Sequence, residues 1–180
     1  MKKAKGRKSA RKPAKAAAKT LKKKVNPIPA GYNSVTPYLA IRGAAEALEF
    51  YKKAFGAKEI MRMPGPGGSI GHAEIGIGDS RLMLADEFPD MKFLGPQARG
   101  GTTVSIHVYV KDVDALVERA VAAGAKLTRA VENQFYGDRT GTLEDPFGHM
   151  WHFATHVEDV SMAELRKRAA QKAGQAGGSP

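Results

Sequence analysis

The feature that most restricts the fold of this chain is an internal repeat in the order of its elements. Helical patterns at residues 43–56 and 112–124 run into the same tripeptide, Gly-Ala-Lys, at positions 56–58 and 124–126. Each helical pattern follows a strand pattern and precedes further segments of alternating, strand-like sequence. A tripeptide match alone is weak evidence, but the repeated order of elements indicates two related units. The sequence therefore predicts an α+β fold built from two βαβββ modules.

The first strand of each module is predicted to have one apolar face and one polar face. The apolar faces consist of Val35, Pro37, Leu39 and Ile41 in the first module and Val104, Ile106, Val108 and Val110 in the second. The buried helical stripes are expected to be Ala44, Ala47, Leu48, Tyr51 and Phe55 in the first module and Val113, Leu116, Val117, Ala120 and Val121 in the second. Asp112 is expected to be an N-cap and Gly56 a C-cap. The other strand faces then point away from the helices and carry Thr36, Tyr38, Ser105, His107 and Tyr109.

The last hairpin, with a type I turn predicted at residues 145–148, contains three of the five histidines of the chain. In the strand after the turn, Trp151 and Phe153 share one face and His152 lies on the other. Because large aromatic side chains favour the packed face, we expect His152 to point toward the concave side of the sheet.

His149 at the turn and His156 at the strand end are expected to form hydrogen bonds with the backbone, so the three histidines of this hairpin are not ligands of one ion. A second hairpin is predicted around Gly78 and Asp79. Before it, His72 and Glu74 share one strand face and add two possible metal ligands or ligand-binding groups.

The positive charge of the chain is concentrated at its start. Residues 1–25 hold twelve of the 29 Lys and Arg and none of the 18 Asp and Glu, which leaves a nearly neutral remainder. We expect residues 1–26 to be a disordered Lys/Ala-rich tail, which either contacts nucleic acid non-specifically through residues 2–24 or acts as a solubilising tail. The globular domain is expected at 27–160. Residues 161–180 are predicted to be a short helix, opened by a capping box at 161–164, and a frayed end.

Composition excludes several classes of site. The chain has no cysteine, which rules out disulfides, thiolate zinc sites and a cysteine nucleophile. No apolar run is long enough for a membrane span, and the basic start lacks the apolar segment of a secretory signal. We therefore expect a cytoplasmic protein without membrane association.

Several segments in one order carry a family likeness. PYLAIRGAAEALEFYKKAFGA, HAEIGIGDSRLMLADE, HVYVKDVDALVERAVAAGA and GDRTGTLEDPFGHMWHFATHVEDVS together resemble the glyoxalase/bleomycin-resistance superfamily, also called vicinal oxygen chelate, and most closely its PhnB-like branch. The likeness covers about residues 27–160. It implies a cupped mixed sheet formed by the two modules, a ligand cavity inside it, and a homodimer.

The resemblance also implies where a divalent metal ion would bind. Metal-using relatives take one ligand from the first strand and one from a late strand of each module, and these positions fall on Thr36, Met83, Ser105 and His152. Only His152 is a strong ligand, which departs from the metal-binding pattern. His107 and His72 are the further candidate ligands, with Glu74 as a general base whose pKa is raised by partial burial.

The residues expected to bind substrate are Thr36, Tyr38, Ser105, Tyr109 and Arg139. For Arg139 an ion pair that holds the loop to the hairpin is an equally open interpretation.

Three functions remain open. The first is an enzyme that binds a small oxygen-bearing molecule and acts as a metal-assisted lyase, isomerase or related enzyme. The second is a protein that sequesters such a molecule without metal, and the third is a DNA-associated protein that acts through its tail.

Overall fold

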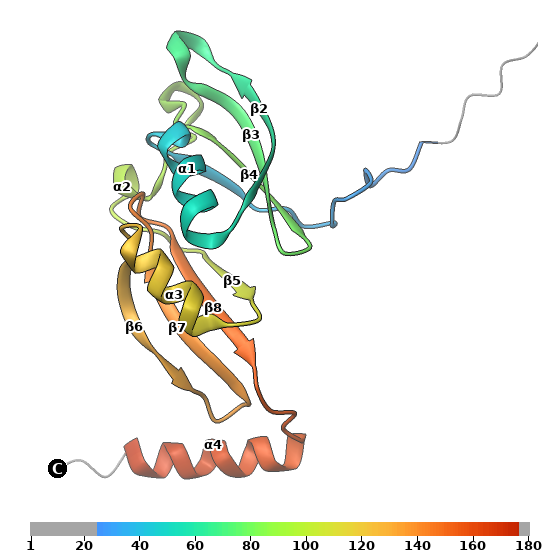
Figure 1. Cartoon of the computed structure of the whole chain (residues 1–180), viewed down its shortest axis with the longest axis vertical. Coiled ribbons are helices and arrows are strands. Elements are labelled where there is room, and N and C mark those ends of the chain that lie inside the picture. The colour runs from blue at the N-terminus through green and yellow to red at the C-terminus, as the bar shows by residue number, and fades with distance from the viewer. Residues whose placement is uncertain (1–24, 177–180) are drawn as a thin grey trace, which may run out of the picture.

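The computed structural model describes residues 25–176 (Figure 1). The first module consists of β1 (Tyr38–Ile41), α1 (Ala44–Phe55), β2 (Lys58–Pro64), β3 (Ile70–Ile77) and β4 (Ser80–Asp86). The second consists of β5 (Ser105–Tyr109), α3 (Val113–Ala122), β6 (Lys126–Asn133), β7 (Asp138–Glu144) and β8 (Met150–His156). A short helix, α2 (Pro96–Arg99), lies in the connection, and α4 (Met162–Ala176) follows the second module. The predicted tail up to residue 24 and the frayed end at 177–180 lie outside the described residues.

Each module forms its own four-stranded mixed sheet, with the strand orders β1-β4-β3-β2 and β5-β8-β7-β6. The first strand of each module runs parallel to the last, and the remaining pairs are antiparallel. The predicted α+β fold of two βαβββ modules is therefore confirmed.

The strand registers also show which positions of the two modules correspond. Tyr38 faces Met83 across β1 and β4, and His107 faces His152 across β5 and β8. The next strands add Glu74 opposite Met83, and Thr142 opposite His152. Tyr38 thus corresponds to His107, Met83 to His152, and Glu74 to Thr142.

The two modules share one hydrophobic core between their helices. Figure 1 shows the modules arranged along the long axis of the molecule, with α1 and α3 on the same side of their sheets. The ring of Phe55, at the end of α1, lies 4.8 Å from those of Trp151 and Phe153 on β8, all three being buried. Helices α1 and α3 therefore cover one face of each sheet, and no helix of residues 25–176 covers the opposite faces, which are called the uncovered faces below.

The predicted caps and most of the predicted core are confirmed. The side chain of Asp112 accepts a hydrogen bond of 3.0 Å from the backbone of Ala115, and Gly56 ends α1 with φ of 68°. The predicted burial of Val35 and Val104 is wrong, because each precedes its strand and is more than two-thirds exposed. Val121, in the last turn of α3, is also exposed, since only the stripe ending at Ala120 reaches the core.

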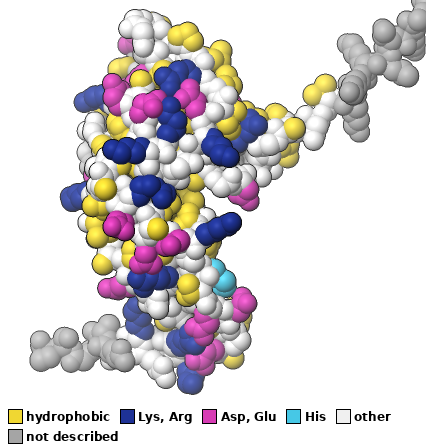
Figure 2. Space-filling model, viewed as in Figure 1, with side chains coloured by type: hydrophobic (Ala, Val, Ile, Leu, Met, Phe, Trp, Pro, Cys, Tyr) yellow, Lys and Arg dark blue, Asp and Glu magenta, His cyan; other side chains and the backbone are white. Residues whose placement is uncertain are grey.

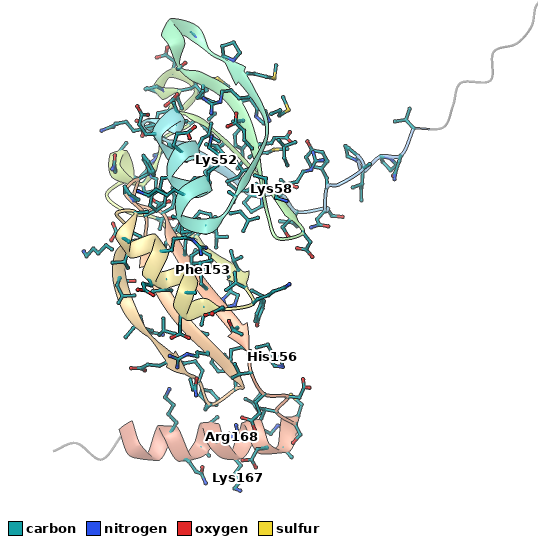
Figure 3. The ribbon with its side chains drawn as sticks, in the orientation of Figure 1. Lys52, Lys58, Phe153, His156, Lys167 and Arg168 are labelled. Atoms are coloured by element: carbon teal, nitrogen blue, oxygen red, sulfur yellow. The ribbon has the colours of Figure 1, made fainter. Side chains whose placement is uncertain are left out.

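Helix α4 is connected to the segment that follows β8 through charged groups. Ser161 caps α4 as predicted, accepting a hydrogen bond from the backbone of Glu164 at 3.3 Å. Arg168 binds both carboxylate oxygens of Glu158, at 2.8 and 2.7 Å, just after β8 (Figure 3).

Over the described body, Lys and Arg alternate with Asp and Glu on the visible surface (Figure 2). No helix among residues 25–176 is long and apolar enough to cross a membrane.

Candidate functional site

The uncovered sheet face of the first module is built around the buried carboxylate of Glu74. The Tyr32 hydroxyl lies 2.5 Å from each carboxylate oxygen, Arg81 donates at 3.2 Å, and His72 Nε2 lies at 3.3 Å. Burial alone would raise the pKa of Glu74, but the hydrogen bonds from Tyr32, His72 and Arg81 outweigh it and lower the pKa. The predicted raised pKa is therefore wrong, and Glu74 is an ionised carboxylate at neutral pH.

A chain of hydrogen bonds links this carboxylate to Tyr38. His72 Nδ1 lies 3.0 Å from the Tyr38 hydroxyl, while its Nε2 faces Glu74. An ionised carboxylate only accepts hydrogen bonds, so in neutral His72 the proton is assigned to Nε2 and Nδ1 accepts from Tyr38. Tyr38 is 46% exposed, so its ring reaches the surface while His72 orients its hydroxyl.

The equivalent face of the second module holds two neighbouring imidazoles. The rings of His107 and His152 are stacked with centroids 6.3 Å apart, and His152 Nδ1 lies 3.0 Å from the hydroxyl of Thr142. Burial, followed by the charges of His107 and Arg129, lowers the pKa of His152. His152 is therefore neutral at pH 7 and, as predicted from the sequence, lies on the face opposite Trp151.

The far end of the same face carries a separate polar cluster. Tyr109 donates a hydrogen bond of 2.8 Å to the buried Asp138, whose other oxygen lies 2.7 Å from Nδ1 of His156. Figure 3 shows His156 where β8 ends and the chain turns toward α4. Its Nε2 faces Asp159 at 3.1 Å, so the predicted backbone hydrogen bond of His156 is wrong. The two carboxylates raise the pKa of His156.

His149, by contrast, does bond to the backbone as predicted. Its Nε2 lies 3.2 Å from the carbonyl oxygen of Ala40, which ties the last hairpin to β1. Burial lowers the pKa of His149, against the opposing effects of Asp145 and of the Ala40 carbonyl. This histidine connects the two modules.

The candidate metal ligands do not come together. His72 lies in the first module beside Glu74, while His107 and His152 lie in the second. Residues 25–176 contain no group of three His, Asp or Glu side chains placed to hold one metal ion. The oxygens of Glu74 are already bound by Tyr32, His72 and Arg81. The donor set of one chain therefore does not fit the divalent ion that the family resemblance implies.

A cavity of about 850 Å³ lies where β1 and β5, both edge strands, approach each other. Among the predicted site residues, Tyr38, Ser105 and His107 line it. A second cavity of about 430 Å³ is lined by Tyr109 and Arg81, and His107 borders both. The two cavities thus adjoin the uncovered faces of both modules.

Two of the predicted substrate-binding residues lie elsewhere. Thr36 precedes β1 and lines neither cavity, and its hydroxyl donates to the carbonyl oxygen of Asn33 at 3.4 Å. Arg139 lies on the helix-covered face of β7, where it binds both oxygens of Asp114 in α3 at 2.7 and 2.6 Å. The structure therefore supports the alternative interpretation of Arg139 as an ion pair, with helix α3 in place of the hairpin as the partner.

Sequence reasoning missed the segment that closes the larger cavity. The connection between the modules contributes Lys92, Phe93, Arg99, Thr102 and Thr103 to its lining. The connection has no periodic pattern, so neither helix nor strand templates detect it. Its one local signal is the Gly100-Gly101 pair, both glycines having positive φ, which turns the chain back toward β5.

The buried carboxylate of Asp145 was also missed. It accepts hydrogen bonds from the Tyr51 hydroxyl at 2.7 Å and from the indole N–H of Trp151 at 2.9 Å. Backbone N–H groups of Phe147 and His149 bind its other oxygen, both at 2.9 Å. Asp145 therefore fixes the turn of the last hairpin against α1 and is a structural residue.

Known proteins share this architecture. A family model described as Glyoxalase/Bleomycin resistance protein/Dioxygenase superfamily matches residues 32–153. The uncharacterized protein Mb0911c of Mycobacterium bovis is 44% identical over 136 residues, covering 74% of this chain and 90% of that protein. TioX from Micromonospora sp. ML1 has a TM-score of 0.55 at 25% identity, covering 72% of this chain and 100% of TioX. The PhnB protein from Bacillus cereus, 18% identical with a TM-score of 0.55 over 68% of this chain and 99% of its own, shares the fold.

Proposed function

Because the chain belongs to the glyoxalase/bleomycin resistance protein/dioxygenase superfamily, we propose that it binds a small oxygen-bearing molecule in the cavity between β1 and β5. The observation that carries this proposal is the cavity itself. Its volume of about 850 Å³ lies within the range of small-molecule sites, roughly 300–1,000 Å³. Its walls combine aromatic and apolar surface with a few polar groups, which is the usual make-up of such sites.

The proposed ligand contacts are Tyr38, Ser105 and His107. Tyr38 is the best positioned of the three, because His72 orients its hydroxyl and its ring packs edge-on against Phe93 with centroids 5.1 Å apart. Because its own proton is donated to His72, a hydroxyl held in this way accepts a directed hydrogen bond from a hydroxyl group of the ligand. His107 corresponds to Tyr38 in the second module and supplies an imidazole from the opposite side.

The test is a nuclear magnetic resonance screen of small carboxylates, ketones and phenols against the full chain. Binding in the cavity shifts the backbone amide signals of Ser105 and His107. Ser105→Trp fills the cavity and abolishes these shifts, whereas Ser34→Trp, at an exposed position outside both cavities, leaves them unchanged. Ligands that bind Ser105→Trp as well as the unmodified protein would place the site elsewhere.

A second function, proton transfer to or from the bound ligand, is favoured by the chain Tyr38–His72–Glu74. As Tyr38 takes a proton from the ligand, its own hydroxyl proton passes to His72 Nδ1, and the imidazolium is stabilised by the ionised Glu74. The products are a ligand anion and a protonated His72, so charge and protons balance. The test is deuterium exchange from D₂O into ligands found in the screen, which His72→Gln abolishes while binding persists. A purely sequestering protein shows no exchange.

The divalent ion suggested by the family resemblance is tested separately. Metal analysis of protein purified without chelator measures it directly, since a stoichiometric ion would require donors from more than one chain.

We infer that a second copy does pack on the uncovered sheet faces, forming a homodimer. Met61 and Met63 lie opposite Glu74 and His72 on this face and are 37% and 52% exposed. Light scattering at micromolar concentration is expected to give twice the chain mass, and Met63→Glu to shift it toward the monomer.

A further inference from the structure

We infer that the cavity between β1 and β5 selects ligands carrying an oxyanion, such as a carboxylate or phosphate group, on a small apolar body. This inference rests on the proposed binding function and specifies its ligand class. It is carried by the charges of the segment that closes the cavity, residues 92–104.

Two cationic side chains line the cavity, Lys92 and Arg99, and no Asp or Glu lines it. Among residues 25–176 neither cation takes part in an ion pair. One guanidinium nitrogen of Arg99 donates to the carbonyl oxygen of Lys92 at 3.0 Å, which holds the two residues together. The remaining N–H donors of Arg99 have no partner in the described part of the chain, so they are available to a ligand.

Two acidic groups next to the lining residues, Glu87 and Asp145, are bound elsewhere, and the exposed Asp90, two positions before Lys92, does not line the cavity. Glu87 accepts from the backbone of Gly95 at 2.9 Å and pairs with Arg42 at 3.0 Å. Asp145, beside the turn that carries His149, is buried and bound to Tyr51. Neither carboxylate lines the cavity. The two cations therefore give the cavity a positive potential that these acids do not cancel.

Hydroxyl groups supply the donors that an oxyanion needs in addition to charge. The side chains of Thr103 and Ser105 line the cavity and form no hydrogen bond within residues 25–176. Thr102 is different, because its hydroxyl donates to the carbonyl oxygen of Val104 at 2.7 Å and so shapes the turn into β5. Charge-assisted hydrogen bonds to carboxylate or phosphate oxygens are stronger than those between neutral groups.

The rest of the wall accounts for the apolar body. Phe93, Val104, Met150 and the ring of Tyr38 line the cavity beside the cations, and Val104 is 71% exposed. A ligand with an aromatic or short aliphatic body covers this surface while its anionic group reaches Arg99 and Lys92. A polymer such as nucleic acid does not fit into a volume of about 850 Å³.

The experiment titrates four probes of similar size into the full chain: benzoate, phenyl phosphate, benzamide and benzylamine. Amide signals of Thr103 and Ser105 report binding. We expect benzoate and phenyl phosphate to bind about tenfold more tightly than neutral benzamide, the ratio given by one charge-assisted hydrogen bond, and benzylamine to bind least. The preference should shrink as salt rises, because the cations are solvent-exposed.

Matched variants identify the groups responsible. Arg99→Gln and Lys92→Gln should each reduce benzoate affinity by about fivefold to tenfold while leaving benzamide unchanged. Arg166→Gln, which removes an exposed cation of α4, serves as the control and should change neither. Equal affinity for benzoate and benzamide at these amides would overturn the charge selection but leave the binding site intact. If no probe shifts these amides at millimolar concentration, the binding proposal fails as well.

Discussion

The sharpest prediction compares two neighbours on β8, Trp151 and His152, whose side chains point to opposite faces of the sheet. Trp151 is fully buried between the modules, with the rings of Phe55 and Tyr51 at 4.8 and 5.4 Å. Its indole N–H also binds Asp145. His152 lies on the uncovered face, and its side chain forms one hydrogen bond within residues 25–176, to Thr142. Truncating each residue to alanine therefore separates the core from the candidate site.

Trp151→Ala removes a buried aromatic ring, which costs about 3–5 kcal/mol in transfer and cavity terms. Domains of this kind are stable by about 5–15 kcal/mol, so the loss is a large fraction of the total. The melting temperature should fall by roughly 6–20 °C, at about 2–4 °C per kcal/mol. His152→Ala removes one neutral, partly exposed hydrogen bond and should cost only about 0.5–1.5 kcal/mol.

Urea unfolding followed by far-ultraviolet circular dichroism is the appropriate assay, because Trp151 is the only tryptophan and its fluorescence is lost in the variant. Trp151→Phe is the control, since it keeps an aromatic ring but removes the N–H that binds Asp145, and should cost about 1–3 kcal/mol. If His152→Ala destabilises the protein as much as Trp151→Ala, the uncovered face is part of the core and the assignment of the site is refuted.

Three further outcomes are expected. Asp145→Asn should cost about 2–4 kcal/mol in urea unfolding, because its amide N–H₂ would face the donors of Tyr51 and Trp151; a loss below about 1 kcal/mol would contradict this structural role of Asp145. Burial holds the pKa of His149 below its usual 6.5, so the stability that neutral His149 confers is complete above about pH 6.5 and is lost as the pH falls through its folded pKa. His149→Gln should therefore flatten the pH dependence of stability below pH 6.5, and an unchanged pH profile would contradict this. Deleting residues 1–24 should leave the melting temperature unchanged and abolish a salt-sensitive shift of DNA in a gel, whereas a shift that persists would place DNA binding in the body.

The sequence was sufficient for the parts of the fold that depend on periodicity. The helical stripe around Leu48 and Tyr51 and the alternation of Trp151 with His152 were predicted because burial follows the 3.6 and 2.0 residue periods. The resemblance to the superfamily rested on the segments that contain this helix and this strand. The errors at Val35 and Val104 arose where a pattern was extended beyond the strand, since the alternation carries no information about where strand pairing stops.

The candidate site was harder to predict because its contacts are long-range. Tyr32, which contacts Glu74 from 42 positions away, lies in a Pro/Gly/Asn-rich segment without a periodic pattern. Without that contact, burial alone determined the expected pKa of Glu74, and the direction came out reversed. The position of Arg139 was hard to predict for a similar reason. Its face depends on the register of β7, and only the contact with Asp114 reveals which side it occupies.

The two modules share a backbone plan but have diverged at equivalent positions of their uncovered faces. Where the first module has the ionised Glu74, the second has the neutral Thr142, and where the first has Met83, the second has His152. The first face can therefore stabilise a positive charge that forms on His72, whereas at the equivalent position of the second face the hydroxyl of Thr142 lies beside His152. Tyr38 and His107 are themselves equivalent, and they meet at the one cavity that both first strands border. A ligand bound there would lie between the phenol of Tyr38, which is connected through His72 to the carboxylate of Glu74, and the imidazole of His107. We therefore expect the proposed proton transfer to use Tyr38, the lining residue that is connected to a carboxylate.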